Sequence, residues 1–443
     1  MRKGANRGVG SENGLERGVD LVDSPIVWSH RLGKAEKPMR IALVTETFLP
    51  SVDGVVTRLA HGIDWLAAQG HELAVVAPDL GVRDYDGAPV LGVKAITWPV
   101  YRSRPWGTPS PKVARYLQAF KPDVVHVWQP DMIGLAAVQA CTRLGLPLVT
   151  SYHTDTIAYL DYYGPLRTIK RPGTWYERRL HNQAPLTLAT SRAMAQKLRE
   201  RGVAHVAVLP RGVDLDARDP RFASAAMREM LSGGHPERPL LLYVGRVAAE
   251  KNLASLEPVM RRHPEWSLAV VGDGPALEPM RRLFAGTPTV FTGFLGGEEL
   301  SSAFASADAF VFPSTTETLG LVILEAQASG VAVVAAASPA TCEQIRDGVN
   351  GMVYDPDDPT ALEQALERLL DSEPLRRRIA DAGCQAALAQ GWDRASAALL
   401  DAYRLVLGIY GAGWRPPAHP GRRLAKTHAA CVPDLSKLPP RVR

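Results

Sequence analysis

Short apolar runs alternate with longer amphipathic stretches along the sequence, first in one half and then again in the other. This alternation constrains the fold more than any other sequence feature. In the first half the apolar runs predict strands at residues 41–44, 73–77, 124–127, 146–150 and 186–189. The stretches between them, such as 55–68 and 132–144, have the spacing of amphipathic helices. Short strands that are apolar on both faces are typical of a parallel sheet covered by helices.

The same pattern starts again after a break. Residues 210–239 are rich in proline, glycine and charge, and beyond them we predict strands at residues 240–244, 268–271, 290–292, 309–312 and 331–335. A chain of 443 residues exceeds what one hydrophobic core usually serves. The sequence therefore predicts an α/β protein with two doubly wound, Rossmann-like parallel-sheet domains, in which ligands bind at the carboxyl ends of the strands, in a cleft.

We place the domain boundaries where the pattern stops. In chain order we predict a disordered extension at 1–38, a first domain at 39–210, a linker at 211–238, a second domain at 239–412 and a basic tail at 413–443. The second domain is expected to close with a helix near 396–407. The tail is rich in proline and arginine, so it could touch anionic lipid headgroups or remain a solvated end.

The spacing of the cysteines, the length of the apolar runs and the pattern of basic and aromatic residues argue against several classes of protein. The four cysteines are scattered and form no C-x-x-C pair, which argues against a zinc site or a disulfide framework and fits a reducing cytoplasm. No apolar run approaches the roughly 20 residues that span a bilayer. Because basic and aromatic residues do not interleave, we predict no nucleic-acid partner.

Two acidic residues in the second half form the strongest candidate site. Glu317 and Glu325 are eight positions apart, with Gly320 and an apolar run that resembles a helix start between them. On one helix the two acids would lie roughly 10 Å apart, which suits gripping two ends of an extended ligand. The helix amides could also hold an anion. By spacing alone, two unrelated surface acids remain an alternative.

Cations and glycines follow two predicted strands of the same half. Gly245 ends the strand at 240–244, and Arg246 and Lys251 lie in the loop behind it. An arginine fork and a lysine point charge suit a diphosphate, although ordinary loop cations would look the same. Gly272 ends the next strand, where a glycine permits close approach of the backbone to a ligand.

The first half supplies two further candidates. Gly54 lies in a glycine loop between the first strand and a helix, which is where phosphates meet backbone amides. The loop is not G-x-G-x-x-G, so a dinucleotide site of that kind is disfavoured. His153 follows the strand at 146–150 and could hydrogen-bond a sugar or transfer a proton, although a lone histidine is often structural.

In this order the motifs resemble glycosyltransferase family 4, a family of retaining enzymes with the two-domain GT-B fold. The resemblance covers residues 39–410, and its most specific part is Glu317 and Glu325 with Gly320 between them. The supporting stretches are 245–251, 272–275 and 211–214. The family resemblance implies a metal-independent hexosyltransferase that needs no cofactor and uses a nucleotide diphosphate sugar as its donor.

The resemblance also implies a role for each candidate residue. The residues assigned to catalysis are His153, Arg246, Lys251 and Glu317, and those assigned to donor binding are Gly54, Gly272, Phe294, Gly320 and Glu325. Arg246 and Lys251 would clamp the diphosphate, and Glu325 would hold the ribose. Glu317 would face the transferred sugar, with His153 beside the reaction centre.

Gly54 and Phe294 complete the implied donor site from two sides. Gly54 would close on the diphosphate from the first domain, which would carry the acceptor. The backbone near Phe294 would touch the nucleotide base. The resemblance therefore divides the work between an acceptor-side first domain and a donor-binding second domain.

Within the family, the stretches 151–154, 211–214 and 316–320 look like those of sulfoquinovosyl-diacylglycerol synthases and lipid α-mannosyltransferases. Those enzymes use UDP-sugars and GDP-mannose respectively, so the donor base stays open. The likeness implies a lipid acceptor, such as diacylglycerol or a phospholipid, and peripheral contact with an anionic membrane from the cytoplasm. Residues 338–343 depart from the family's Gly-Gly-x-Pro-Glu turn, which leaves donor preference open.

Other functions remain open on the sequence alone. A transferase could act on a soluble small molecule or a polysaccharide. A nucleotide-sugar epimerase of the same fold would convert the donor without an acceptor. A non-catalytic binding protein would keep the cleft and show no turnover.

Overall fold

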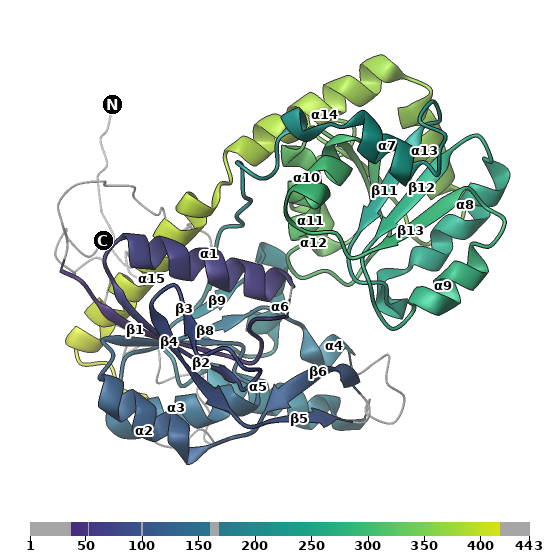
Figure 1. The fold of residues 1–443 in the computed structure, drawn as a ribbon. Helices are drawn as coiled ribbons and strands as arrows, with labels where there is room; N and C mark the ends of the chain where they lie inside the picture. The colour runs from purple at the N-terminus through teal and green to yellow at the C-terminus, as the bar shows by residue number, and fades with distance from the viewer. Residues whose placement is uncertain (1–36, 52, 99–100, 160–167, 417–443) are drawn as a thin grey trace, which may run out of the picture. The chain divides into compact units, whose positions relative to one another are not determined.

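The first domain is built on a parallel sheet whose strands are buried on both faces. The computed structural model describes residues 37–51, 53–98, 101–159 and 168–416 (Figure 1). In sheet order the strands are β10 (Val206–Val208), β9 (Thr187–Ala189), β8 (Leu148–Tyr152), β7 (Val124–Trp128), β1 (Arg40–Thr45), β2 (Glu72–Pro78), β4 (Ala88–Val93) and β3 (Asp84–Tyr85). All neighbours pair parallel except β3 and β4. The five strands predicted in this half are confirmed.

Helices follow these strands as the pattern predicts. They are α1 (Gly54–Ala68), α2 (Pro111–Phe120), α3 (Met132–Leu144), α4 (Thr156–Tyr159), α5 (Lys170–His181) and α6 (Arg192–Glu200). Asp53 begins α1, because its carboxylate accepts from the amides of Val55 and Val56 at 2.9 and 3.0 Å. Gly145 ends α3 in the left-handed conformation that favours glycine.

Several short strands were not predicted. Besides β3, β4 and β10, a two-stranded sheet pairs β5 (Ala95–Trp98) with β6 (Tyr101–Gly107) antiparallel. β3 and β10 are the edge strands of the main sheet, β4 lies next to β3, and β5 and β6 lie outside this sheet. β3, β5 and β10 are only two to four residues long, β4 is interrupted by Pro89 and Gly92, and β6 carries two arginines, so the sequence pattern does not mark them as buried strands.

The second domain has a wholly parallel sheet. In sheet order its strands are β13 (Thr289–Gly293), β12 (Ser267–Val271), β11 (Leu240–Val244), β14 (Ala309–Phe312), β15 (Ala332–Ala336) and β16 (Met352–Tyr354). Its α-helices are α7 (Ala225–Leu231), α8 (Glu257–Arg262), α9 (Leu277–Leu283), α10 (Gly297–Ala305), α11 (Leu321–Ala328), α12 (Pro339–Cys342), α13 (Ala361–Leu370) and α14 (Glu373–Leu388). Both domains are therefore parallel-sheet α/β layers, as predicted.

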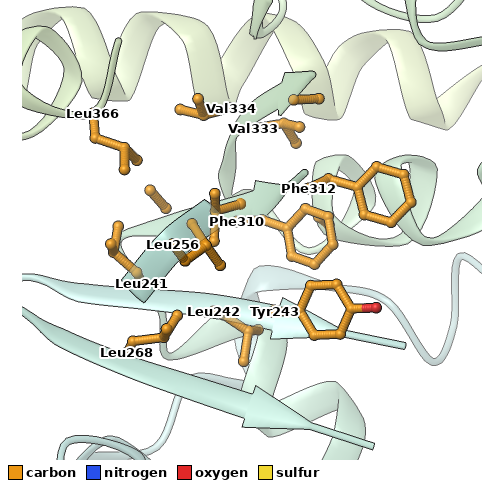
Figure 2. Packing of buried hydrophobic residues seen from close by; sticks show 14 of the residues in the cluster. Leu241, Leu242, Tyr243, Leu256, Leu268, Phe310, Phe312, Val333, Val334 and Leu366 are labelled. Atoms are coloured by element: carbon orange, nitrogen blue, oxygen red, sulfur yellow. The ribbon is translucent and has the colours of Figure 1, made fainter. Parts of the chain in front are cut away.

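The core of this domain lies against the central strands. Leu241, Tyr243, Phe310 and Val333 are completely buried, and Figure 2 shows their side chains clustered on these strands. The rings of Phe310 and Phe312 lie 6.0 Å apart. Burying such large side chains stabilises the domain by about 1.5–3 kcal/mol for each of them. The central strands are consequently rigid supports for the loops at their carboxyl ends.

The order of strands reverses at one point in each sheet. From β11 the chain proceeds through β12 to β13 on one side, and then through β14 to β16 on the other. In the first sheet the reversal lies between β1 and β7. Ligands of open α/β sheets bind outside the strand ends at such reversals. The fold thus directs attention to the loops after β11, β14 and β1.

Part of the predicted linker folds with the second sheet. The 3₁₀ helix η3 (Pro220–Phe222) and α7 both lie within residues 211–238. Leu231, at the end of α7, is completely buried in the core of the second domain. The positions of the domain boundaries themselves stay a prediction.

The closing helix packs on the first sheet. Our predicted helix at 396–407 is confirmed within α15 (Trp392–Gly411), which lies beside α1 and β8. Its Tyr403 hydroxyl bonds His126 Nδ1 of β7 at 2.9 Å. These contacts are with the first sheet and with α1, and the assignment of this helix to the second domain stays a prediction.

Two predicted segments at the ends of the chain lie largely outside the described residues. These are the disordered extension at 1–38 and the basic tail at 413–443. Within the described ranges, no helix combines the length and the apolarity that crossing a lipid bilayer requires.

Candidate functional site

The loop after β11 carries the two predicted cations. Arg246 forms an ion pair with Glu250, and its carbonyl accepts a hydrogen bond from the Tyr243 hydroxyl at 3.0 Å. Lys251 ends the 3₁₀ helix η4 (Ala249–Lys251) that follows. Because Tyr243 is buried in the central strand, this hydrogen bond fixes the Arg246 backbone to the core.

A second loop is braced against the first through Gly272. Gly272 has φ +135°, and a Cβ atom there would lie 2.0 Å from the carbonyl oxygen of Gly245. Val247 donates its amide to the Asp273 carbonyl at 2.9 Å, which joins the loops after β11 and β12 again. Glycine is therefore required here by contact between two backbone segments, whereas we expected it to admit a ligand.

Glu317 lies in the loop between β14 and α11. It forms an ion pair with Lys251 and accepts from the Ser314 hydroxyl at 3.2 Å. The expectation that both acids share one helix was wrong, since α11 begins only at Leu321. Gly320, in the left-handed conformation at φ +64°, separates the loop from the helix. The structure thus brings together Lys251 and Glu317, which are 66 positions apart in the sequence.

Glu325 lies on α11 and has a partner that sequence reasoning missed. Its carboxylate accepts from Arg218 at 3.1 Å, and Arg218 also donates to the Ser301 hydroxyl at 2.9 Å. Arg218 carries no motif of its own, and only tertiary contact identifies it. The pairing orients the carboxylate while leaving its side chain 27% exposed, so it can still accept further hydrogen bonds.

Phe294 stands at the same edge of the sheet. It follows β13 directly, and the preceding Gly293 carbonyl accepts from the Gly272 amide at 2.8 Å. The Phe294 side chain is 62% exposed. An exposed aromatic ring beside a glycine loop can stack on a planar ligand, although it is not held in place by packing.

Gly54 and His153 are the two candidate site residues that lie in the first domain. A Cβ atom on Gly54 would lie 3.4 Å from Cδ1 of Leu321, so the first residues of α1 and α11 are neighbours. The His153 carbonyl accepts from the Thr318 hydroxyl at 2.7 Å. Both residues therefore lie close to the loop that carries Glu317.

His153 is held in one orientation. Its ring stacks on Trp128 at 4.6 Å, and Nε2 bonds the Ser151 hydroxyl at 2.7 Å. Burial, with a contribution from the nearby Arg58 charge, holds the pKa of His153 well below its usual range. The imidazole is accordingly neutral at physiological pH, which suits hydrogen bonding better than service as a cationic acid.

Behind His153 lies a buried network that sequence reasoning did not find. The Tyr152 hydroxyl donates to Asp155 and to Glu177 of α5, both at 3.1 Å, and Arg201 donates to both acids at 2.9 and 3.3 Å. Hydrogen bonds from Lys197 and Arg201 lower the pKa of Asp155 despite its burial. Burial raises the pKa of Glu177 to about 7 against the opposing Arg201 charge.

The raised pKa of Glu177 predicts a pH dependence of stability. Because its folded-state pKa lies above the ordinary value of 4.5, the native state binds the proton more tightly than the unfolded chain. Raising the pH from 5 to 8 should therefore lower the wild-type free energy of unfolding by roughly 2.5 kcal/mol relative to Glu177→Gln. Melting curves of both proteins across this range measure the difference. A constant difference would contradict the prediction.

Residues 338–343, which differ from the family's Gly-Gly-x-Pro-Glu turn, form hydrogen bonds that explain their structure. Ser338 caps the short helix α12, accepting from the Thr341 amide at 3.1 Å. Glu343 accepts from the first amides of α6, at Arg192 and Ala193, at 2.9 and 2.5 Å. A carboxylate at a helix N-terminus is stabilising. The altered turn is therefore an ordered element that joins α12 to α6.

Comparison with known proteins gives two family matches. Residues 232–385 match the family described as glycosyl transferases group 1, and residues 52–217 match glycosyltransferase family 4. The sulfoquinovosyl transferase SQD2 of Arabidopsis thaliana is 37% identical over 85% of this chain and 74% of its own length.

Two further proteins extend the comparison. A GDP-mannose-dependent alpha-(1-6)-phosphatidylinositol monomannoside mannosyltransferase of Mycolicibacterium smegmatis is 31% identical over 75% of this chain and 90% of its own. Among solved structures, the sucrose-phosphate synthase from Thermosynechococcus elongatus has a TM-score of 0.67 at 20% identity and covers 84% of this chain and all of its own. At that identity the likeness concerns the fold, which is the predicted GT-B fold.

Proposed function

Since the chain belongs to glycosyltransferase family 4, we propose that it moves a hexose from a nucleotide diphosphate sugar to a hydroxyl group of a membrane lipid, with retention and without a metal. One observation carries the proposal. Arg246 and Lys251 follow β11, Glu317 follows β14, and these two strands flank the order reversal of the second sheet. An anionic leaving group placed there would meet two cations on rigid supports.

Arg246 and Lys251 would stabilise the charge that builds on the leaving β-phosphate. In the ligand-free protein each is paired with a carboxylate, Glu250 or Glu317. These pairs hold the cations in place before the donor arrives, so little reorganisation is needed when the sugar–phosphate bond breaks. An interaction of this kind commonly contributes about 3–4 kcal/mol to transition-state stabilisation.

Glu325, Glu317 and Phe294 would position the rest of the donor. Glu325, oriented by Arg218, would accept from the ribose hydroxyls, and Glu317 would face the transferred sugar. Phe294 would lie beside the base. Gly320 and Gly272 would act indirectly, because they shape the loops that carry these residues.

From the first domain, Gly54 would contact the diphosphate and His153 would contact the sugar. Neutral His153 would hydrogen-bond a sugar hydroxyl. The acceptor hydroxyl would then attack the anomeric carbon from the face that the diphosphate leaves, and its proton would pass to the departing phosphate oxygen. This route retains the anomeric configuration without a covalent sugar–enzyme intermediate.

The names of the relatives support a lipid acceptor and leave the donor base open. The mycolicibacterial relative is named for GDP-mannose and for a phosphatidylinositol mannoside, whereas SQD2 is named for a sulfoquinovosyl group. We therefore propose a cytoplasmic enzyme that meets the membrane peripherally, with diacylglycerol or a phospholipid as acceptor.

A donor screen tests the proposal. Purified protein is incubated with UDP- and GDP-sugars, with and without a lipid acceptor, and free UDP or GDP is measured. Nucleotide release that depends on the acceptor would identify the donor class. Conversion of the donor without any acceptor would favour an epimerase, and the absence of both release and thermal stabilisation would contradict the assignment.

Glu325→Gln should weaken donor binding more than it slows the chemical step. The amide can still accept from Arg218, so the fold is kept, but it loses charged hydrogen bonds to the ribose. We expect KM for the donor to rise about tenfold, with kcat within a factor of three. Steady-state kinetics measures both. Glu363→Gln is the matched control, since Glu363 is also paired with an arginine, Arg262 at 2.7 Å. Equal KM values for the two variants would contradict the role of Glu325.

A further inference from the structure

The outer face of α5 combines exposed apolar residues with several cations. Trp175 is 48% exposed, and so is Ile169 just before the helix. Arg171, Arg178 and Arg179 are exposed at positions that flank Trp175 on the helix surface. The Arg179 guanidinium lies 5.3 Å from the Trp175 ring centre. In the described part of the chain, none of these three arginines pairs with an acidic side chain.

Beside Trp175 the surface is hollowed. A cavity of about 340 Å³ is lined by Lys170, Arg171, Thr174, Trp175 and Arg178. Three cations, one hydroxyl and an aromatic ring around an open hollow suit a phosphate group whose other end is apolar. Tryptophan prefers the boundary between lipid headgroups and hydrocarbon.

The opposite face of α5 is fixed to the candidate site. Glu177, the one acid in α5, is buried and accepts from the hydroxyls of Tyr152 and Thr156, both at 3.1 Å. Tyr152 directly precedes His153 in the chain. A Cβ atom on Gly173 would lie 2.5 Å from Cδ1 of Ile157 in α4, so α5 packs tightly on the segment that follows His153. Whatever α5 binds is thereby held near the acceptor side of the site.

We infer that this face of α5, defined by Ile169, Arg171, Trp175, Arg178 and Arg179, docks on an anionic phospholipid surface. Trp175 and Ile169 enter the interface, and the cations bind headgroup phosphates. The inference rests on the lipid acceptor of the proposed function and assigns the membrane contact to α5.

Vesicle sedimentation of the full chain tests the inference. The vesicles contain phosphatidylcholine with or without phosphatidylglycerol, at low and at physiological salt. Wild type should bind the anionic vesicles preferentially. Arg171→Gln with Arg178→Gln should lower the partition coefficient about 30-fold at low salt, and Trp175→Ala should lower it about tenfold at either salt concentration.

Two charge-matched variants serve as controls. Arg377→Gln with Arg378→Gln removes the same charge from α14, where both residues are exposed. Arg422→Gln with Arg423→Gln removes it from the basic tail. Both controls should bind vesicles like wild type. Loss of binding in the tail variant, with the α5 variants unchanged, would overturn the inference. So would a dimer that depends on Trp175 and forms without vesicles.

Activity with a short-chain, water-soluble acceptor separates the two proposals. The α5 variants should release nucleotide from donor and soluble acceptor at the wild-type rate, because no site residue is changed. If these variants bound vesicles and glycosylated lipid like wild type, the docking inference would be overturned and the proposed function would stand. Absence of any transfer by wild type, with α5-dependent vesicle binding intact, would contradict the proposed function alone.

Discussion

Arg246→Ala is expected to lower kcat by about 100- to 1000-fold, with a smaller change in KM for the donor. The guanidinium sits where charge develops on the leaving phosphate, and its backbone is fixed by the buried Tyr243. Its loss therefore affects the transition state more than the ground state. Steady-state kinetics with the donor found in the screen measures both constants.

Arg261→Ala is the matched control for this variant. Arg261 also pairs with a glutamate four positions away, Glu257, but lies exposed on α8. It should leave kcat within a factor of two of wild type. If Arg246→Ala and Arg261→Ala had equally small effects, the diphosphate would have to bind elsewhere and the site assignment would be wrong.

Gly272→Ala is expected to destabilise the protein by about 3 kcal/mol or more and to abolish tight donor binding. The new methyl group would overlap the Gly245 carbonyl oxygen, 2.0 Å away, at a φ of +135° that side chains rarely adopt. Relief requires separation of the loops after β11 and β12, which moves Arg246. Chemical denaturation and donor titration measure the two effects.

Gly286→Ala is the control that distinguishes destabilisation by steric overlap from destabilisation by backbone strain. Gly286 also has a positive φ, +80°, but nothing lies within 4 Å of the added Cβ. Its substitution should cost only about 1 kcal/mol and leave donor binding unchanged. Equal destabilisation by the two substitutions would show that contact between the loops is not what requires glycine at position 272.

The sequence alone was sufficient to predict the central strands and the order of the motifs along the chain. Strands such as β11 and β14 are apolar at every position, and in a run of four or five residues between helical stretches that pattern indicates a strand buried on both faces. Edge strands such as β3 and β10 were missed. They are two and three residues long, and their pairing depends on neighbours rather than on their own composition.

What the sequence by itself determined was which side chains follow which strands, because local periodicity and burial fix the elements and their ends. Arg246 and His153 could each be placed after a strand in this way, whereas Glu317 was expected on a helix. The tertiary structure alone decided their partners. Lys251 meets Glu317 across 66 positions, Arg218 meets Glu325 across 107, and α15 packs on the first sheet. Such pairings follow from strand order and from which surfaces remain to be buried, and no local pattern encodes either of these.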